Sequence, residues 1–364
     1  MFLYLYFTPE PITIDMKPVF LLSLLFVCAC ACTKSSTAND DSSGTTDDDL
    51  AGPVSRPSGG YGKDGNYTVA KVSFASPTYT GKLVEVFYPK EATGPVPVIF
   101  YSHPYGGEES SYNIGLYGFI AKKGYAVVFA PYPTTGVSID DRYNTLWQSF
   151  KKAVANYPNM LDTRKVGFMG HSFGGGASFA LGHRAFTQEG WGANGRFLFV
   201  MAQWYAHQLT DSMLQSFPAN TRLITEVFND DVTNDHRLAI DIFKNINIPA
   251  AEKDYILVKK TELPGYTYTA GHDLPNTRNA YDAYDYYVVY RLLDALADYS
   301  FNGNAAAKNT ALGNGSAAQV TLPSYNGQAL TPLTVTDNPT PLFLQSKYLF
   351  PCGSTDNPRK SNCQ

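Results

Sequence analysis

A serine between two glycines is the strongest chemical signal in the sequence. Ser172 stands at the centre of a G-x-S-x-G motif, Gly170-His171-Ser172-Phe173-Gly174, which follows an apolar run and precedes further small residues. Between a strand and a helix, this motif places the serine on a tight turn with its hydroxyl accessible, and the glycines leave room for neighbouring backbone. The pattern therefore predicts that Ser172 is a nucleophile.

A serine nucleophile needs a base to take its proton and an acid to orient that base. On a strand–turn–helix nucleophile motif, the acid and then the histidine follow the serine along the chain. Asp230 comes directly after an apolar run and is the predicted acid, with Asp231 and Asp235 as alternatives. His272 is the predicted base, because every other histidine precedes the acid or follows it too closely.

Backbone N–H groups are expected to stabilise the negative charge that develops on a substrate carbonyl. Phe173, directly after the nucleophile, should supply one of these donors. A second should come from the early loop His103-Pro104-Tyr105-Gly106-Gly107. Proline has no N–H, so the sequence predicts Tyr105 as the donor, with its side chain left free to cover the acyl site.

Strand-like and helix-like segments alternate along the part of the chain that must position these residues. The strand candidates are mostly continuous apolar runs, which is typical of strands covered on both faces. They are Leu83–Tyr88, Val96–Ser102, Ala126–Pro131, Val166–Gly170, Phe197–Ala202, Leu223–Phe228 and Tyr255–Lys260. The helix candidates are Ile114–Lys123, Asp140–Asn156, Gly174–Phe186, His236–Asn245 and Arg278–Tyr299. We therefore predict an α/β fold over residues 53–300, with a doubly wound, mostly parallel sheet and helices on both faces.

The ends of the chain have different compositions from this domain. Residues 1–31 are predicted to be a leader and an export signal, because the apolar run up to Cys32 is shorter than a bilayer span and follows Met16-Lys17. Cys30 or Cys32 resembles the lipidated cysteine of bacterial lipoproteins, which predicts a membrane-anchored lipoprotein or, failing that, a secreted protein. Residues 32–52 are a predicted flexible linker rich in Ser, Thr and Asp.

Residues 301–364 are predicted to be a C-terminal extension that packs on the domain. In an oxidising compartment, Cys352 and Cys363 are expected to form a disulfide. The chain has 28 Lys and Arg against 32 Asp and Glu, a net charge of −4, which argues against a nucleic-acid-binding surface. The sequence has no phosphate-binding loop, dinucleotide fingerprint or paired-histidine motif, so no cofactor and no metal are expected. We expect a monomer whose only membrane contact is its lipid anchor.

Over about residues 53–295, this set of residues resembles the α/β-hydrolase superfamily, and within it the dienelactone-hydrolase-like group that includes cutinase-type polyester hydrolases and chlorophyllases. In the polyester hydrolases, an aromatic residue of the first loop donates a backbone N–H and a tryptophan follows the strand after the nucleophile helix. Tyr105 and Trp204 stand at similar places here. The sequence departs from that group at Phe173, where a methionine is usual, in lacking a cysteine pair near the acid and base, and in its longer tail.

The resemblance implies the α/β-hydrolase fold and a serine hydrolase that cleaves carboxylic esters through an acyl-enzyme, including bulky, aromatic or polymeric esters. The residues expected to contact substrate are Tyr105, His171, Trp204 and Tyr205. One alternative is a serine peptidase of the prolyl-oligopeptidase type, although the chain has no room for the propeller domain that this group usually carries. Another is a catalytically silent surface lipoprotein that binds a glycan or a protein through its aromatic residues.

Overall fold

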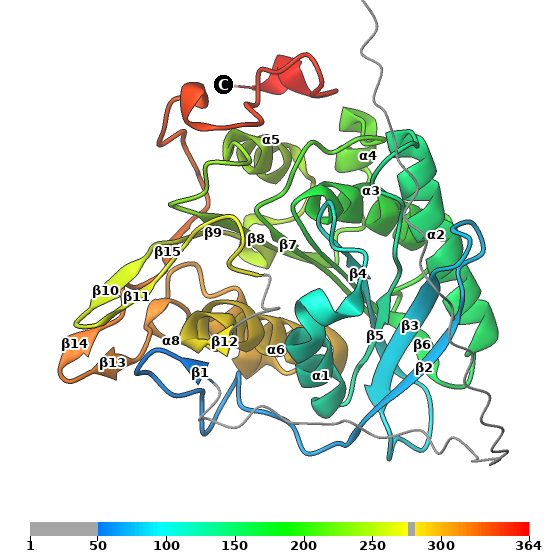
Figure 1. Ribbon diagram of the computed structural model, residues 1–364, viewed down its shortest axis with the longest axis horizontal. Coiled ribbons are helices and arrows are strands. Elements are labelled where there is room, and N and C mark those ends of the chain that lie inside the picture. Colours follow the sequence, from blue (N-terminus) through cyan, green and yellow to red (C-terminus); the bar gives the residue numbers. More distant parts are fainter. Residues whose placement is uncertain (1–49, 276–280, 364) are drawn as a thin grey trace, which may run out of the picture. The chain divides into compact units, whose positions relative to one another are not determined.

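A nine-stranded sheet runs through the computed structural model, which describes residues 50–275 and 281–363 (Figure 1). In spatial order its strands are β15 (Thr334–Thr336), β9 (Lys253–Val258), β8 (Thr221–Phe228), β7 (Gly195–Met201), β6 (Leu161–His171), β4 (Val96–Ser102), β5 (Ala126–Phe129), β3 (Leu83–Pro89) and β2 (Val69–Ala75). The strands from β9 to β5 pair in parallel, while β2, β3 and β15 join antiparallel at the two edges.

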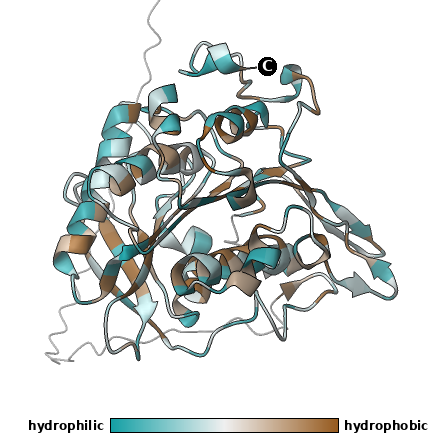
Figure 2. Cartoon of the chain, turned by 180° about the vertical axis from the view of Figure 1, so that it is seen from behind, coloured by the Kyte–Doolittle hydropathy of each residue, from teal (hydrophilic) through white to brown (hydrophobic). Residues whose placement is uncertain are grey.

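Helices cover both faces of this sheet. On one face, α2 (Ile139–Asn156), α3 (Phe173–Thr187), α4 (Asp211–Gln215) and α5 (Arg237–Asn245) bury their apolar side chains against the strands. On the other face lie α1 (Ile114–Lys122) and α6 (Arg291–Ala297). The central strands are accordingly apolar on both sides, and Figure 2 shows them mostly in the hydrophobic colour. The α/β prediction with a mostly parallel sheet and helices on both faces is confirmed.

Local sequence explains where several of these elements begin and end. The helix α2 starts in a capping box: the Ser138 hydroxyl accepts a hydrogen bond from the Asp141 N–H at 3.1 Å, and the Asp141 carboxylate accepts one from the Ser138 N–H at 3.2 Å. The predicted long helix Arg278–Tyr299 is wrong at Tyr281 and Asp282. Residues 276–280 lie outside the described part of the chain, and Tyr281–Asp282 forms the short strand β12, paired in parallel with β1 (Leu50–Ala51). Helical structure then begins at Ala283 and continues into a π-helical segment, Asp285–Tyr290.

The chain after α6 adds short elements to the domain. They are a second π-helical segment Asp298–Asn302, the helices α7 (Lys308–Ala311) and α8 (Ala317–Val320), and the hairpin of β13 (Ser324–Tyr325) and β14 (Gln328–Ala329). A further hairpin of β10 (Thr261–Leu263) and β11 (Tyr266–Tyr268) follows β9. Single turns of 3₁₀ helix lie at Ser110–Asn113, Ala250–Glu252, Ala305–Ala307, Gln345–Lys347 and Lys360–Asn362. Because β15 is an edge strand of the main sheet, the C-terminal extension is hydrogen-bonded to the α/β domain through its pairing with β9.

A disulfide joins Cys352 and Cys363 near the end of the chain. The predicted export signal, the candidate lipid sites Cys30 and Cys32 and most of the predicted linker lie outside the described residues. Over the residues that are described, no helix is both long enough and apolar enough to cross a membrane.

Candidate active site

Ser172 lies at the junction between β6, which ends at His171, and α3, which begins at Phe173. Its backbone has φ 54° and ψ −119°, a conformation that costs a non-glycine residue about 1–3 kcal/mol. The end of β7 holds it there: the Ser172 N–H donates to the Met201 carbonyl at 3.0 Å, and the Trp204 N–H donates to the Ser172 carbonyl at 2.8 Å. The strand–turn–helix context predicted for the G-x-S-x-G motif is therefore present.

The two glycines of the motif are required by close backbone approach. A Cβ at Gly170 would overlap the Gly174 carbonyl, and a Cβ at Gly174 would overlap the Ser102 carbonyl at the end of β4. The start of α3 is thus in van der Waals contact with the loop that carries Tyr105. This contact fixes the distance between the nucleophile turn and the Tyr105 loop, which the sequence linked only through their expected roles in catalysis.

Ser172, His272 and an aspartate form one hydrogen-bonded chain. The Ser172 Oγ lies 3.0 Å from His272 Nε2, and His272 Nδ1 lies 2.8 Å from the Asp231 carboxylate. A carboxylate only accepts hydrogen bonds, so Nδ1 carries the proton and Nε2 is free to accept the Ser172 hydroxyl proton. The Asp231 side chain is 4% exposed and that of His272 is 15% exposed, so the pair is largely shielded from water.

The prediction of Asp230 as the acid is wrong, because the carboxylate beside His272 Nδ1 belongs to Asp231, which was one of the alternatives. The Asp231 N–H donates to the Phe228 carbonyl at 3.1 Å, which makes a turn directly after β8. This turn brings the second aspartate toward the imidazole. Asp230 instead donates its N–H to the Ala270 carbonyl at 2.9 Å, and its carboxylate accepts from the Asn229 amide. Asp235, the other alternative, is buried and pairs with Arg237.

Asn234 contacts the nucleophile, and sequence reasoning missed it. Its Nδ2 donates to Ser172 Oγ at 3.2 Å and to the Ala202 carbonyl at 2.8 Å. Because the Ala202 carbonyl can only accept, the amide nitrogen must lie on this side. A serine oxygen that accepts from Asn234 keeps its own hydrogen for His272, so Asn234 helps to orient the hydroxyl. Nothing in the local sequence distinguishes this asparagine from any other polar loop residue.

His103 fixes the peptide that carries the predicted Tyr105 donor. Its Nε2 accepts the Tyr132 N–H at 3.2 Å, so its Nδ1 carries a proton and donates to the Pro104 carbonyl at 2.7 Å. The Gly107 N–H donates to the same carbonyl at 3.0 Å. In a trans peptide the C=O and N–H point in opposite directions, so the Tyr105 N–H points away from these donors. Burial lowers the pKa of His103 to about 4, which keeps the ring neutral in this role.

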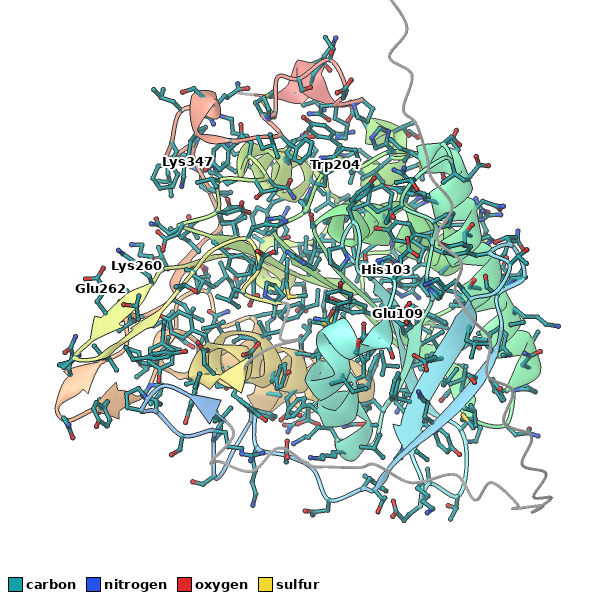
Figure 3. The ribbon with its side chains drawn as sticks, viewed as in Figure 1. His103, Glu109, Trp204, Lys260, Glu262 and Lys347 are labelled. Atoms are coloured by element: carbon teal, nitrogen blue, oxygen red, sulfur yellow. A yellow bond between two sulfur atoms is a disulfide. The ribbon has the colours of Figure 1, made fainter. Side chains whose placement is uncertain are left out.

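Phe173 and the predicted substrate-contacting residues occupy different environments. Phe173 is the first residue of α3, where a helix amide has no acceptor within the helix. Tyr105 is 56% exposed. Trp204, labelled in Figure 3, is partly buried, and its ring stacks on Phe173 with the ring centroids 5.6 Å apart. Two expectations are wrong. His171 is fully buried, with its ring 4.8 Å from the His272 ring, and Tyr205 is buried with its hydroxyl donating to the Pro351 carbonyl.

Searches against known proteins add no family assignment to this geometry. No model of a known protein family matches the chain, and no curated protein matches it significantly.

Proposed function

We propose that the protein is a serine carboxylic-ester hydrolase with the α/β-hydrolase fold, acting through an acyl-enzyme. The observation that carries this proposal is the hydrogen-bonded chain from Ser172 through His272 to Asp231, with Ser172 on a strained turn. Strained backbone at a nucleophile between a buried strand and a helix is typical of this fold. The order of the three residues along the chain is the order found in that fold.

In the proposed reaction, Ser172 Oγ attacks the carbonyl carbon of the ester while His272 Nε2 takes the hydroxyl proton. The carbon–alkoxide bond then breaks, and the departing alcohol takes the proton from Nε2. A water molecule attacks the acyl-serine with His272 again as the base, and the acid product leaves as Ser172 regains its proton. Asp231 stabilises the imidazolium that forms twice in this cycle and holds its tautomer.

The oxyanion of each tetrahedral intermediate is proposed to bind the backbone N–H groups of Tyr105 and Phe173. Support comes from the fixed Pro104 carbonyl, which orients the Tyr105 amide, and from the place of Phe173 at the start of α3. Donors held in place before the reaction stabilise developing charge without reorganisation, and each is worth about 3–4 kcal/mol in the barrier.

Bulky, aromatic or polymeric esters are the proposed substrate class. Tyr105 exposes more than half of its surface, and Arg142 lies 5.4 Å from its ring centroid. Trp204 stacks on Phe173 and also contacts Phe350 edge to face, with ring centroids 5.7 Å apart. Aromatic side chains offer large, rigid contact areas to such substrates. The protein is further proposed to be exported, and the Cys352–Cys363 disulfide supports an oxidising compartment.

The test is hydrolysis of p-nitrophenyl butyrate by the purified protein and by Ser172→Ala. We expect the variant to lose at least about 10⁴-fold in kcat, because the residual rate of triad-deficient serine hydrolases comes only from binding and the oxyanion donors. A fluorophosphonate probe should label the native protein once, at Ser172. Hydrolysis of a long-chain or polymeric ester, compared with the short ester, then tests the substrate class.

Thr187→Ala is the matched control, because Thr187 is the last residue of α3, at the opposite end from Phe173, and its hydroxyl donates only to the His183 carbonyl at 2.8 Å. This variant should hydrolyse and label like the native protein. If the native protein neither hydrolyses the ester nor reacts with the probe, the hydrolase proposal is rejected and a silent binding protein becomes the better explanation. Equal activity of the native protein and Ser172→Ala would reject Ser172 as the nucleophile.

A further inference from the structure

The last part of the chain runs along the loop that carries Asp231 and Asn234. We call residues 342–363 the C-terminal strap and residues 229–236 the acid loop. The Leu349 N–H donates to the Val232 carbonyl at 2.9 Å, the Phe350 N–H donates to the Thr233 carbonyl at 2.8 Å, and the Asp235 N–H donates to the Phe350 carbonyl at 3.2 Å. Asn234 and Phe350 form an isolated parallel bridge. In Figure 1 the strap is the orange-to-red segment that passes α5.

Two successive peptide groups of the acid loop connect the strap with the Asp231 carboxylate. In the first, the Val232 carbonyl accepts from the strap, while the Thr233 N–H donates to Asp231 Oδ1 at 2.6 Å. In the second, the Thr233 carbonyl accepts from the strap, while the Asn234 N–H donates to the same oxygen at 3.2 Å. Because a trans peptide is planar, fixing its carbonyl also fixes the direction of its N–H. The strap therefore orients both donors that hold Asp231 Oδ1.

The strap itself is attached to buried parts of the domain. Arg359, 6% exposed, donates through Nε and Nη2 to the carboxylate of Asp241 on α5, at 2.6 and 2.9 Å. The Tyr348 hydroxyl lies 2.7 Å from His236 Nδ1. Lys347, labelled in Figure 3, donates to the Asn229 carbonyl at 2.6 Å. The disulfide closes the end of the segment. A charged pair with bidentate geometry is both strong and directional, so the strap has a defined position relative to α5.

We propose that the C-terminal strap is a positioning element of the active site, which holds the acid loop so that Asp231 faces His272 and Asn234 faces Ser172. No strap residue touches the reacting atoms, so its effect passes through the acid loop. The effect on turnover rests on the proposed hydrolase function, whereas the effect on the His272–Asp231 hydrogen bond does not. The acid loop forms no helix or longer strand in the described structure, so the strap supplies hydrogen bonds that such a loop otherwise takes from water.

Leu349 allows a test that separates the backbone hydrogen bond from the side chain. Leu349 is 71% exposed, so Leu349→Ala keeps the N–H and removes little packing. Leu349→Pro removes the N–H that donates to Val232. The preceding residue, Tyr348, has φ −110° and ψ 141°, the extended conformation that a following proline requires. The two variants therefore differ in whether residue 349 can donate a hydrogen bond to the acid loop.

We expect Leu349→Pro to lower kcat for p-nitrophenyl butyrate about three- to tenfold with little change in KM. This loss corresponds to about 0.65–1.4 kcal/mol, which is the size of one net hydrogen bond. It should also weaken or shift the far-downfield proton NMR signal of His272 Nδ1–H, assigned by its absence in His272→Gln. Leu349→Ala should match the native protein in both measurements. Thermal unfolding of each variant shows whether it is folded under the assay conditions.

A second pair of variants keeps the proposal testable if Leu349→Pro does not fold. Cys352→Ala/Cys363→Ala releases the end of the strap and should shift the same NMR signal. Asp211→Ala removes only an exposed carboxylate that contacts Arg359 and Asn362, and it should leave the signal unchanged because the buried Arg359–Asp241 pair remains. A native signal and native kcat in a folded Leu349→Pro, or in a folded double cysteine variant, would overturn the strap proposal. An inert native protein whose signal nevertheless shifts in these variants would overturn the hydrolase proposal and leave the strap proposal standing.

Discussion

The Asp231 carboxylate is held by groups on both of its oxygens. Oδ1 accepts the N–H groups of Thr233 and Asn234, and Oδ2 lies 2.8 Å from His272 Nδ1. These bonds fix the orientation of the carboxylate, whose negative charge faces the imidazole and stabilises it when it becomes positively charged. The Asp230 carboxylate has no contact with His272. Its backbone N–H instead donates to the Ala270 carbonyl, which connects the acid loop to the segment just before His272. The two neighbouring aspartates therefore have separate roles, one through a side chain and one through the main chain.

Asp231→Asn is expected to reduce kcat by roughly 10⁴-fold near neutral pH, whereas Asp230→Asn should leave it near the native value. An asparagine at 231 can turn an N–H toward His272 Nδ1 and favour the tautomer whose Nε2 cannot accept the serine proton. At position 230 the backbone hydrogen bond is unchanged. Steady-state kinetics of both variants on one ester decides the assignment, and a larger loss in Asp230→Asn would show that Asp230 is the acid.

At the scale of elements, the active site depends on how closely α3 approaches β4. The nucleophile turn, the start of α3 and the Tyr105 loop meet where Gly174 lies against the Ser102 carbonyl. His103, stacked on Tyr132 with ring centroids 3.9 Å apart, then directs the chain into that loop. Small displacements between α3 and β4 would move the two proposed oxyanion donors relative to each other.

Gly174→Ala is expected to lower the free energy of unfolding by about 1–3 kcal/mol, the usual cost of forcing extra volume into a packed site. It should also lower kcat, because α3 must move away from β4. Gly118→Ala is the matched control: Gly118 lies within α1, and nothing lies within 4 Å of an added Cβ. That variant should gain stability by about 0.5–1 kcal/mol. Urea unfolding measures both changes, and an equally stable Gly174→Ala would contradict the packing argument.

At the scale of the whole molecule, a buried carboxyl links stability to pH. Glu226 on β8 has no exposed surface, and neither of its oxygens has a hydrogen-bond partner among the described residues. Burial raises its pKa well above the usual value, and the attraction of Arg291 offsets this only in part. The folded protein thus keeps the Glu226 proton at pH values where the unfolded chain releases it. Glu226 therefore lowers the free energy of unfolding, and this loss becomes larger as the pH rises above about 4.5.

Glu226→Gln is therefore expected to be more stable than the native protein at pH 8, and the difference should shrink at pH 5. While the folded carboxyl stays protonated and the unfolded one is ionised, the difference grows by roughly 1.4 kcal/mol per pH unit. Comparing the variant with the native protein cancels the titration of all other groups that the substitution leaves unchanged. Urea unfolding at the two pH values provides the measurement, and a constant difference would mean that Glu226 ionises alike in both states.

Local sequence was sufficient for the elements and for part of the site. Continuous apolar runs placed the central strands, and the G-x-S-x-G motif placed Ser172 on its turn, because both depend on neighbouring residues. His272 followed from chain order and lies against Ser172. The local sequence pattern could not decide between Asp230 and Asp231. The choice depends on the turn after β8, in which the Asp231 N–H donates to the Phe228 carbonyl.

Contacts between distant segments were decided by the tertiary structure alone. Asn234 reaches Ser172 across 62 positions of sequence, and Phe350 pairs with Asn234 from the C-terminal extension. His171 and Tyr205 stand beside predicted site residues in the chain, yet their side chains are buried. Periodicity and spacing report which face of an element a residue occupies. They do not indicate which distant segment will form hydrogen bonds with that residue, because the partner is set by the packing of the folded chain.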